Sequence, residues 1–108
     1  MADELAGALN QRVAIETWVA ARDAAGADTG HWQAAGPAYA AVVPDGAGGV
    51  AGEARRSRRR WLVTLRAPTV VSLTSRLIWN GRYLAVLAVE SDPRRPDRVQ
   101  LRCEGREA

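Results

Sequence analysis

Apolar and polar positions alternate most clearly on either side of Asn80-Gly81. Asn and Gly tolerate the positive φ angles of a two-residue type I′ turn, whose twist matches that of the strands it joins. The pattern therefore predicts a β-hairpin formed by residues 70–79 and 82–91. The turn also fixes the register, which places Ile78 opposite Tyr83, Leu77 opposite Leu84 and Ser75 opposite Val86.

Both faces of this predicted hairpin are apolar. An antiparallel sheet normally keeps one face polar for water. We therefore expect one face to line the protein's own core and the other to be covered by a second copy, with Ile78, Tyr83 and Leu87 as the oligomer interface. The first face carries Leu73, Leu77, Trp79, Leu84, Val86 and Ala88, and the second carries Ile78, Tyr83, Ala85, Leu87 and Val89.

Alternation with a period of two recurs in residues 11–20, 31–43, 61–66 and 98–104, and predicts a strand in each segment. Gly36-Pro37 interrupts the second segment and predicts a bulge or a sheet edge there. In the last segment Val99, Leu101 and Cys103 are expected to face inward. Residues 2–10 can form a short helical turn, and residues 22–30 and 92–97 have the composition of turns.

Five or six short strands separated by turns predict an all-β fold, a small antiparallel β-barrel, because closure removes exposed strand edges. The length of 108 residues allows one domain, residues 1–108. Residues 44–60 differ from the rest, since a glycine-rich stretch is followed by an arginine-rich one. They can bury little apolar surface, so we expect a long mobile loop.

The arginine-rich end of this loop is the segment with the most marked chemical character. From Glu53 to Arg66 there are six Arg and one Glu, which gives a local charge of +5. Such a density attracts phosphate backbones or an acidic protein surface, and flexible Arg side chains would bind DNA without sequence preference. The alternative is a loop that is merely solvated. The candidate residues for contact with DNA or a partner are Arg55, Arg56, Arg58, Arg59 and Arg60.

Composition narrows the remaining possibilities. All fifteen cationic residues are Arg, and the net charge is only +3. Cys103 is the single cysteine, so an intramolecular disulfide is impossible and a buried thiol is expected. The chain opens with no secretory signal and contains no apolar run of membrane-spanning length. We therefore expect the protein to be made and kept in a reducing cytoplasm, with no membrane partner.

Motifs for catalysis, metal binding or cofactor binding are not found. His31 is the only histidine, and one His with a distant Cys cannot complete a metal site. Residues 46–52 have the glycines of a phosphate-binding loop but lack its Gly-Lys-Ser/Thr ending. We therefore expect a protein that is not an enzyme and has no cofactor.

The order of these segments resembles the head–tail joining, or head-closure ("stopper"), proteins of tailed bacteriophages and their relatives in gene transfer agents. The similarity extends over nearly the whole chain and depends on order and spacing. One difference is that the arginine-rich loop of this chain is more basic than is common in that family. The residues that carry it are Leu9 to Ile15 (Leu-x-x-Arg-Val-x-Ile), Trp32, Tyr39 to Val42, Trp61 to Arg66, Arg76 to Leu84 (Arg-Leu-Ile-Trp-Asn-Gly-Arg-Tyr-Leu) and Arg98 to Cys103.

The resemblance implies a β-barrel that forms a ring with six- or twelve-fold symmetry in the virion neck, between the portal–adaptor complex and the tail terminator or another tail protein. It also implies that double-stranded DNA passes through the ring and that a long loop can project into the channel. Two other readings remain at this point. One is a nucleic-acid-binding module of the OB or cold-shock type, which would use aromatic residues as stacking platforms. The other is a small barrel enzyme or ligand carrier, which no motif in the sequence supports.

Overall fold

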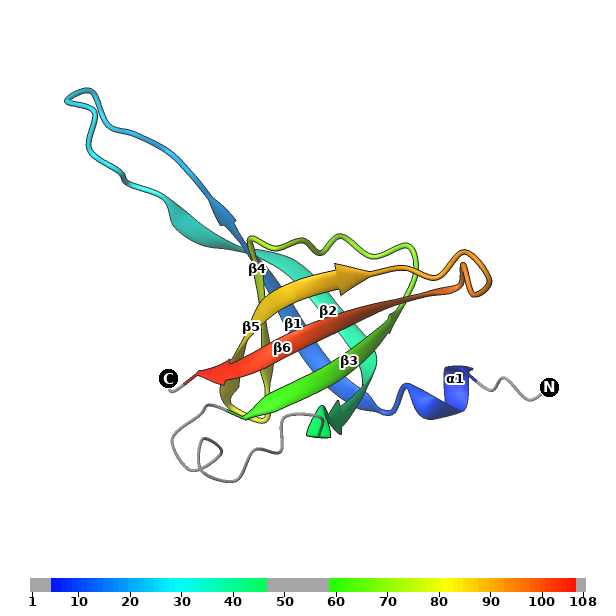
Figure 1. Cartoon of the computed structure of the whole chain (residues 1–108). Coiled ribbons are helices and arrows are strands. Elements are labelled where there is room, and N and C mark those ends of the chain that lie inside the picture. The colour runs from blue at the N-terminus through cyan, green and yellow to red at the C-terminus, as the bar shows by residue number, and fades with distance from the viewer. Residues whose placement is uncertain (1–4, 47–58, 107–108) are drawn as a thin grey trace.

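The computed structural model describes residues 5–46 and 59–106, which form a closed antiparallel β-barrel of six strands (Figure 1). Around the barrel the strands follow the order β1-β2-β3-β6-β5-β4, and β4 pairs with β1 to close it. The prediction of a small all-β barrel is thus confirmed. The elements are α1 (Leu5–Ala8), β1 (Gln11–Val19), β2 (His31–Pro44), β3 (Arg60–Arg66), β4 (Ser75–Trp79), β5 (Arg82–Glu90) and β6 (Arg98–Arg106).

The β4–β5 hairpin has the predicted turn. Asn80 and Gly81 have φ angles of 52° and 76°, as a type I′ turn requires at its two central residues. The register is also as predicted, with Leu77 opposite Leu84 and Ile78 opposite Tyr83. The two leucines are fully buried, so this face of the hairpin lines the barrel core.

The start of β4 differs from the prediction. The strand begins at Ser75 rather than at residue 70, and Leu73, predicted to face the core, is 63% exposed. Hydrogen bonds within residues 72–75 form a turn instead. Ser75 N–H donates to the Ser72 carbonyl at 3.0 Å, and Ser72 N–H donates to Ser75 Oγ at 3.0 Å. Short hydroxyl side chains compete in this way with the strand ladder.

The second half of β5 also corrects the prediction. Val86 lies opposite Cys103, but Ala88 lies opposite Arg102, so Leu87 is an extra, bulged residue. A one-residue shift exchanges the two faces of a strand. Ala88 was predicted to face inward but pairs with an outward-facing Arg. Val89 was predicted to face outward and pairs with the buried Leu101, although it stays 38% exposed near the end of the strand.

A second bulge lies in β2, where the sequence predicted a bulge or an edge. Ile15 pairs with Gly36 and Glu16 pairs with Ala34, so one residue of β2 is left unpaired between them. Gly36 has a φ of 108°, a conformation that favours glycine. This bulge lies where β2 leaves the barrel wall.

The core consists of the side chains that the strands turn inward. Val99, Leu101 and Cys103 are buried as predicted, and burial raises the pKa of the Cys103 thiol to about 12. Trp61 and Trp79 pack edge to face with ring centroids 4.9 Å apart. The buried apolar residues are Leu9, Val13, Ile15, Ala40, Trp61, Val63, Leu65, Leu77, Leu84, Val86, Val99, Leu101 and Cys103.

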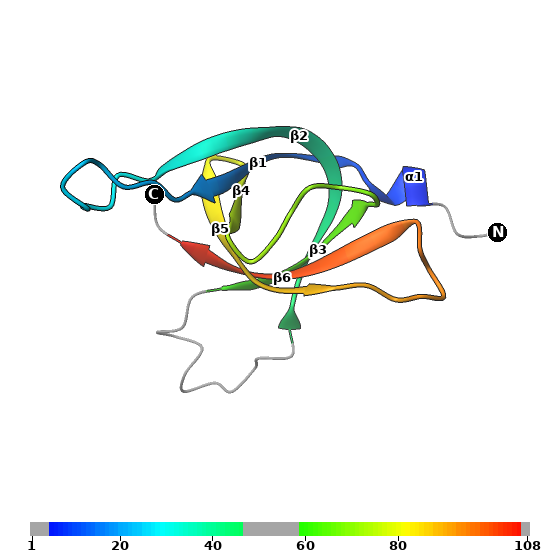
Figure 2. The ribbon, with the colours of Figure 1, turned by 90° about the horizontal axis from the view of Figure 1, so that it is seen from above.

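An arm extends from the barrel, formed by the end of β1, residues 20–30 and the beginning of β2 (Figures 1 and 2). The composition of residues 22–30 predicted only a turn-rich link. The two strands instead remain paired as far as Val19 and His31, and an isolated bridge joins Arg22 to Asp28. We call residues 18–32 the arm and residues 20–30 its tip.

Candidate functional site

One end of the barrel carries arginines, and the described part of the predicted basic loop belongs to it. Arg60 is the first residue of β3 and Arg59 precedes it directly. The Arg59 carbonyl accepts a hydrogen bond of 2.8 Å from Gly105 N–H, which ties it to the end of β6. The other three candidates, Arg55, Arg56 and Arg58, lie outside the described residues.

Two further arginines belong to the same end of the barrel, and the sequence analysis missed both. Arg82 follows the β4–β5 turn, and Arg106 ends β6 opposite Tyr83. Arg60 lies opposite Glu104 on the neighbouring strand. Only the pairing of strands from distant parts of the sequence brings these residues together. We call Arg59, Arg60, Arg82 and Arg106 the basic end.

Among the described residues the basic end retains positive charge, because one carboxylate serves two of its guanidinium groups. Glu104 lies 3.8 Å from Arg60 and 3.6 Å from Arg106, measured between nitrogen and oxygen. Exposed ion pairs of this length contribute little, on the order of 0–1 kcal/mol. The Arg59 guanidinium lies 5.8 Å from the Trp61 ring centroid, and no carboxylate of the described residues forms an ion pair with it. The arrangement can attract an anionic polymer or an acidic protein surface.

The neighbouring outer wall is closer to neutral. Arg102 donates to Asp45 at 2.8 Å and to Glu90 at 3.1 Å. These hydrogen bonds, that of Glu90 first, raise the pKa of the Arg102 guanidinium above its usual value. The charge of Arg102 is thereby balanced locally, and positive charge is concentrated at the basic end.

Arg76 forms the most elaborate contact on the outer wall. Its guanidinium lies between two aromatic rings, 4.0 Å from the Trp32 centroid and 4.2 Å from the Tyr83 centroid. It also pairs with Glu16 at 2.7 Å. These residues come from β1, β2, β4 and β5, so we call Glu16, Trp32, Arg76 and Tyr83 the clasp. Because Arg76 covers a face of both rings, the clasp does not offer them as an open platform for stacking bases.

The predicted oligomer interface lies beside the clasp. Ile78 and Tyr83 are opposite each other and half-buried, and Leu87 is 40% exposed at the bulge. The three residues do lie on the outer side of the hairpin, as the sequence predicted. The Arg76 guanidinium covers one face of the Tyr83 ring, so the apolar surface available to a partner is smaller than the alternation of residues indicated. Its role as an interface stays a prediction.

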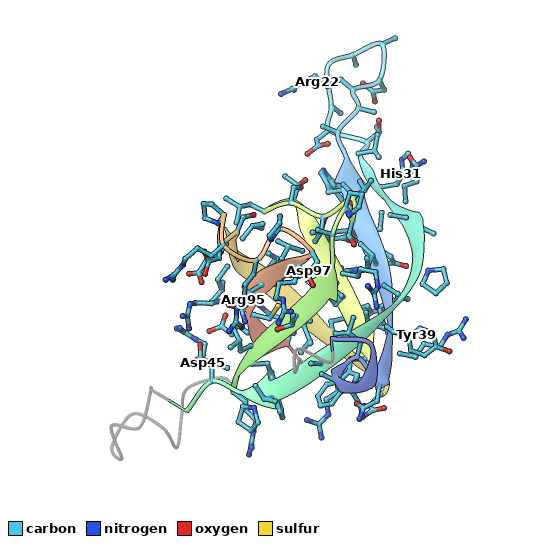
Figure 3. The ribbon with its side chains drawn as sticks, turned by 90° about the vertical axis from the view of Figure 1, so that its right-hand side faces the viewer. Arg22, His31, Tyr39, Asp45, Arg95 and Asp97 are labelled. Carbon is cyan, nitrogen blue, oxygen red and sulfur yellow. The ribbon has the colours of Figure 1, made fainter. Side chains whose placement is uncertain are left out.

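The base of the arm is held by a second edge-to-face tryptophan pair. Trp18 and Trp32 are opposite each other on β1 and β2, with ring centroids 5.3 Å apart and an interplanar angle of 71°. Gly30 lies under the Trp18 ring, where a Cβ atom would come within 2.4 Å of a ring carbon. Figure 3 shows how far Arg22, in the arm, lies from Tyr39 on the barrel wall.

Candidate chemistry of other kinds finds no support in residues 5–46 and 59–106. His31 is exposed on β2, and the described residues contain no group of three or more His, Cys, Asp or Glu side chains that could hold a metal ion. None of the described helices has both the length and the apolar character to span a membrane.

Comparisons with known proteins agree with this architecture. A family model described as "Phage head completion protein" matches residues 5–106. A chain from a solved structure described as "Virion of native gene transfer agent (GTA) particle" is 25% identical, with a TM-score of 0.68, and the match covers 93% of this chain and 97% of that one. The solution structure of protein SF1141 from Shigella flexneri 2a is 20% identical, with a TM-score of 0.72 over 91% of this chain and 93% of that one. No curated protein matches this chain.

Proposed function

This chain belongs to the phage head completion protein family, and from this premise we propose that it forms a ring in the neck of a phage-like particle, through which DNA passes. The single observation that carries the proposal is the family match over residues 5–106, which is nearly the whole chain. Membership in this family also confirms the expectation of a structural, non-enzymatic protein.

The likeness to a virion protein supports the place in a particle. That relative is part of a gene transfer agent virion and aligns over almost the full length of both chains. We infer that the present chain likewise becomes part of a particle assembled in the bacterial cytoplasm. Its neighbours would be the portal–adaptor complex on one side and a tail protein on the other.

The outer face of the β4–β5 hairpin supports a homo-oligomer. Ile78, Tyr83 and Leu87 leave apolar surface exposed or half-exposed on the outside of a barrel whose own core is already complete. A closed ring of six- or twelve-fold symmetry would cover such a surface in every copy.

The basic end supports contact with the DNA in the channel. Arginines that repeat around a ring add their fields, although each exposed arginine alone is screened beyond about 8 Å at physiological salt. The contact would be with phosphates and independent of sequence. It would include the loop candidates Arg55, Arg56, Arg58, Arg59 and Arg60 together with Arg82 and Arg106.

Neutralising the basic end in particles tests this function. The loop variant changes the five candidates to Gln, and a second variant changes Arg82 and Arg106 to Gln. The control changes Arg94 and Arg95 to Gln in the β5–β6 turn, at the other end of β5. We expect all variants to fold, and we expect only the first two to give particles that lose packaged DNA to added nuclease.

Electron microscopy of the same particles separates the two parts of the proposal. A ring of this protein between head and tail, with unchanged DNA retention in both variants, would leave the neck position standing and show that the arginines are merely solvated. Particles whose neck lacks the protein would refute the proposed function itself.

A further inference from the structure

The tip of the arm is preorganised by its own hydrogen bonds. Asp23 Oδ1 accepts from the backbone N–H groups of Ala25 and Ala27, both at 2.9 Å. Asp28 Oδ1 accepts from Gly30 N–H at 3.0 Å. The same oxygen of each carboxylate makes these bonds, so Oδ2 of each remains for an external partner. A tip fixed in this way loses little conformational entropy when it binds.

The exposed side chains of the tip are alanine methyl groups, Thr29, these two carboxylates and Arg22, so two negative charges stand against one positive charge. The one cationic side chain of the tip, Arg22, folds back and donates to the Gly26 carbonyl at 2.9 Å. Residues 20–29 are all exposed, and no other described element packs over them. The methyl groups belong to Ala20, Ala21, Ala24, Ala25 and Ala27.

A cleft of about 410 Å³ lies on the barrel wall between β2 and the end of β3. It opens because β2 and β3 pair only from Ala40 to Pro44, so the earlier part of β2 has a free edge. Among the described residues no carboxylate lines it, and Arg66 is the one charged lining residue. The lining residues are Leu9, Ala38, Tyr39, Arg66, Ala67, Pro68 and Thr69.

Two guanidinium groups flank this cleft. Arg12 lies over the Tyr39 ring, 5.9 Å from its centroid. Asp97 has a lowered pKa chiefly because Arg98 donates a hydrogen bond of 3.0 Å to its carboxylate. The charge of Arg66 contributes least to this lowering. Within the described residues Arg66 forms no ion pair of its own. The cleft therefore presents apolar walls and two cations that an acidic partner could neutralise.

We propose that the tip of one copy's arm docks in the cleft of a second copy, with Asp23 and Asp28 meeting Arg12 and Arg66 and the alanine methyl groups filling the apolar walls. This inference rests on the proposed ring and names the contact that would close it. The two surfaces are complementary in charge, and both are exposed in the single chain.

A second copy is the partner that fits best, because every chain carries both the tip and the cleft, and the two lie far apart on it. The arm reaches beyond the clasp by roughly 20 Å, at about 3.4 Å for each extended residue. A contact between two different patches of identical chains is head-to-tail, and repetition of such a contact generates a ring where the rotation closes.

Engineered cysteines test the contact in the full-length chain. Ala25→Cys marks the tip, Ala67→Cys marks the cleft, and Arg94→Cys in the β5–β6 turn is the control acceptor. The native Cys103 is fully buried and should not react. We expect a short bismaleimide reagent to join a tip-marked chain to a cleft-marked chain with about tenfold higher yield than to the control chain.

Charge variants then test the direction of the contact. Asp23→Asn with Asp28→Asn removes the charges of the arm but keeps the oxygens that organise the turn, and Arg66→Asp reverses the charge of the cleft. The Arg66→Asp chain keeps a native arm, and the double-Asn chain keeps a native cleft. In the first placement Ala25→Cys is on the Arg66→Asp chain and Ala67→Cys is on the double-Asn chain, so a native arm meets a native cleft. We expect full cross-linking in this placement. In the second placement the cysteines are exchanged, so the double-Asn arm meets the Arg66→Asp cleft. We expect the cross-linking yield to fall about tenfold, equivalent to about 1.4 kcal/mol.

Equal yields in the two placements, or no cross-link in either near the solubility limit, would overturn the proposed contact. Electron microscopy of particles distinguishes this from failure of the proposed function. Rings present in the neck without the cross-link would leave the ring standing and refute only the docking of the arm. Particles without such rings would refute both.

Discussion

The barrel interior and the arm are held together by different kinds of interaction. The interior consists mainly of aliphatic side chains around the Trp61–Trp79 pair, and Leu65, Leu77, Leu84 and Leu101 have no exposed surface at all. The arm has no aliphatic core, and the clasp and the Trp18–Trp32 pair pack at its base. We therefore expect the position of the arm to depend on contacts that the barrel fold does not need. A change in the clasp can redirect the arm without unfolding the barrel.

Removing a core leucine should have the largest effect. Leu101→Ala deletes a fully buried side chain on β6, and such deletions cost about 2–5 kcal/mol because a cavity remains. Chemical denaturation measures the free energy of unfolding. Leu73→Ala is the matched control, since Leu73 is 63% exposed, and it should change that free energy by no more than about 0.5 kcal/mol. Similar losses for both would show that the interior does not dominate stability.

Replacing Gly81 should have the next largest effect. Gly81→Val places a β-branched residue at a φ of 76°, and the strain should cost roughly 1–3 kcal/mol. Gly81→Asn serves as the control, because Asn tolerates this conformation. The thermal midpoint should fall clearly for Val and only slightly for Asn. An unchanged midpoint for Val would mean that the turn does not anchor the hairpin register.

Opening the clasp should affect the arm more than the barrel. Arg76→Met removes both ring contacts and the pair with Glu16, and it should cost about 1–2 kcal/mol at this partly exposed site. Amide hydrogen exchange should become faster in residues 16–19 and 31–34 and stay unchanged in β6. Arg82→Met, which removes an arginine outside the clasp, is the control. Uniformly faster exchange would contradict the separation of arm and barrel.

The titration of Cys103 should leave the free energy of unfolding unchanged at neutral pH and lower it only at alkaline pH. Its folded pKa is raised to about 12 from an ordinary value of 9.0, so the unfolded chain loses the thiol proton first. The resulting contribution to stability is present below about pH 9 and is lost as the pH rises toward 12. Cys103→Ala should flatten this part of the stability profile. At pH 8 a thiol reagent should react with the wild-type chain only after unfolding.

Local chemistry explains which features could be predicted from sequence. The hairpin register followed from Asn80 and Gly81, because few residue pairs adopt a type I′ turn. The bulge at Leu87 was missed because its neighbours are all apolar, so no polar residue marks the point where the two faces exchange. Leu73 was misplaced for a related reason, since its alternation continues through a turn that hydroxyl groups form.

The functional surfaces depended on contacts that sequence spacing does not reveal. The basic loop was visible as a run of arginines, but Arg82 and Arg106 join the basic end only through strand pairing. The clasp combines side chains from four strands. The pattern predicts only a link in place of the arm, because hydrophobic alternation stops at Ala20, although backbone pairing keeps the two strands of the arm together.

β2 runs without interruption from the arm into the barrel wall, and this continuity has a mechanical consequence. A pull at the tip would move β1 and β2 together, so it would load in shear the hydrogen bonds that join β1 to β4 and β2 to β3, since these bonds lie perpendicular to the strands. Shear strains all of these bonds at once, whereas peeling breaks them one after another. Tension on an arm would therefore be carried by the barrel wall as a whole, which would suit a protein that has to stay in place within an assembled particle.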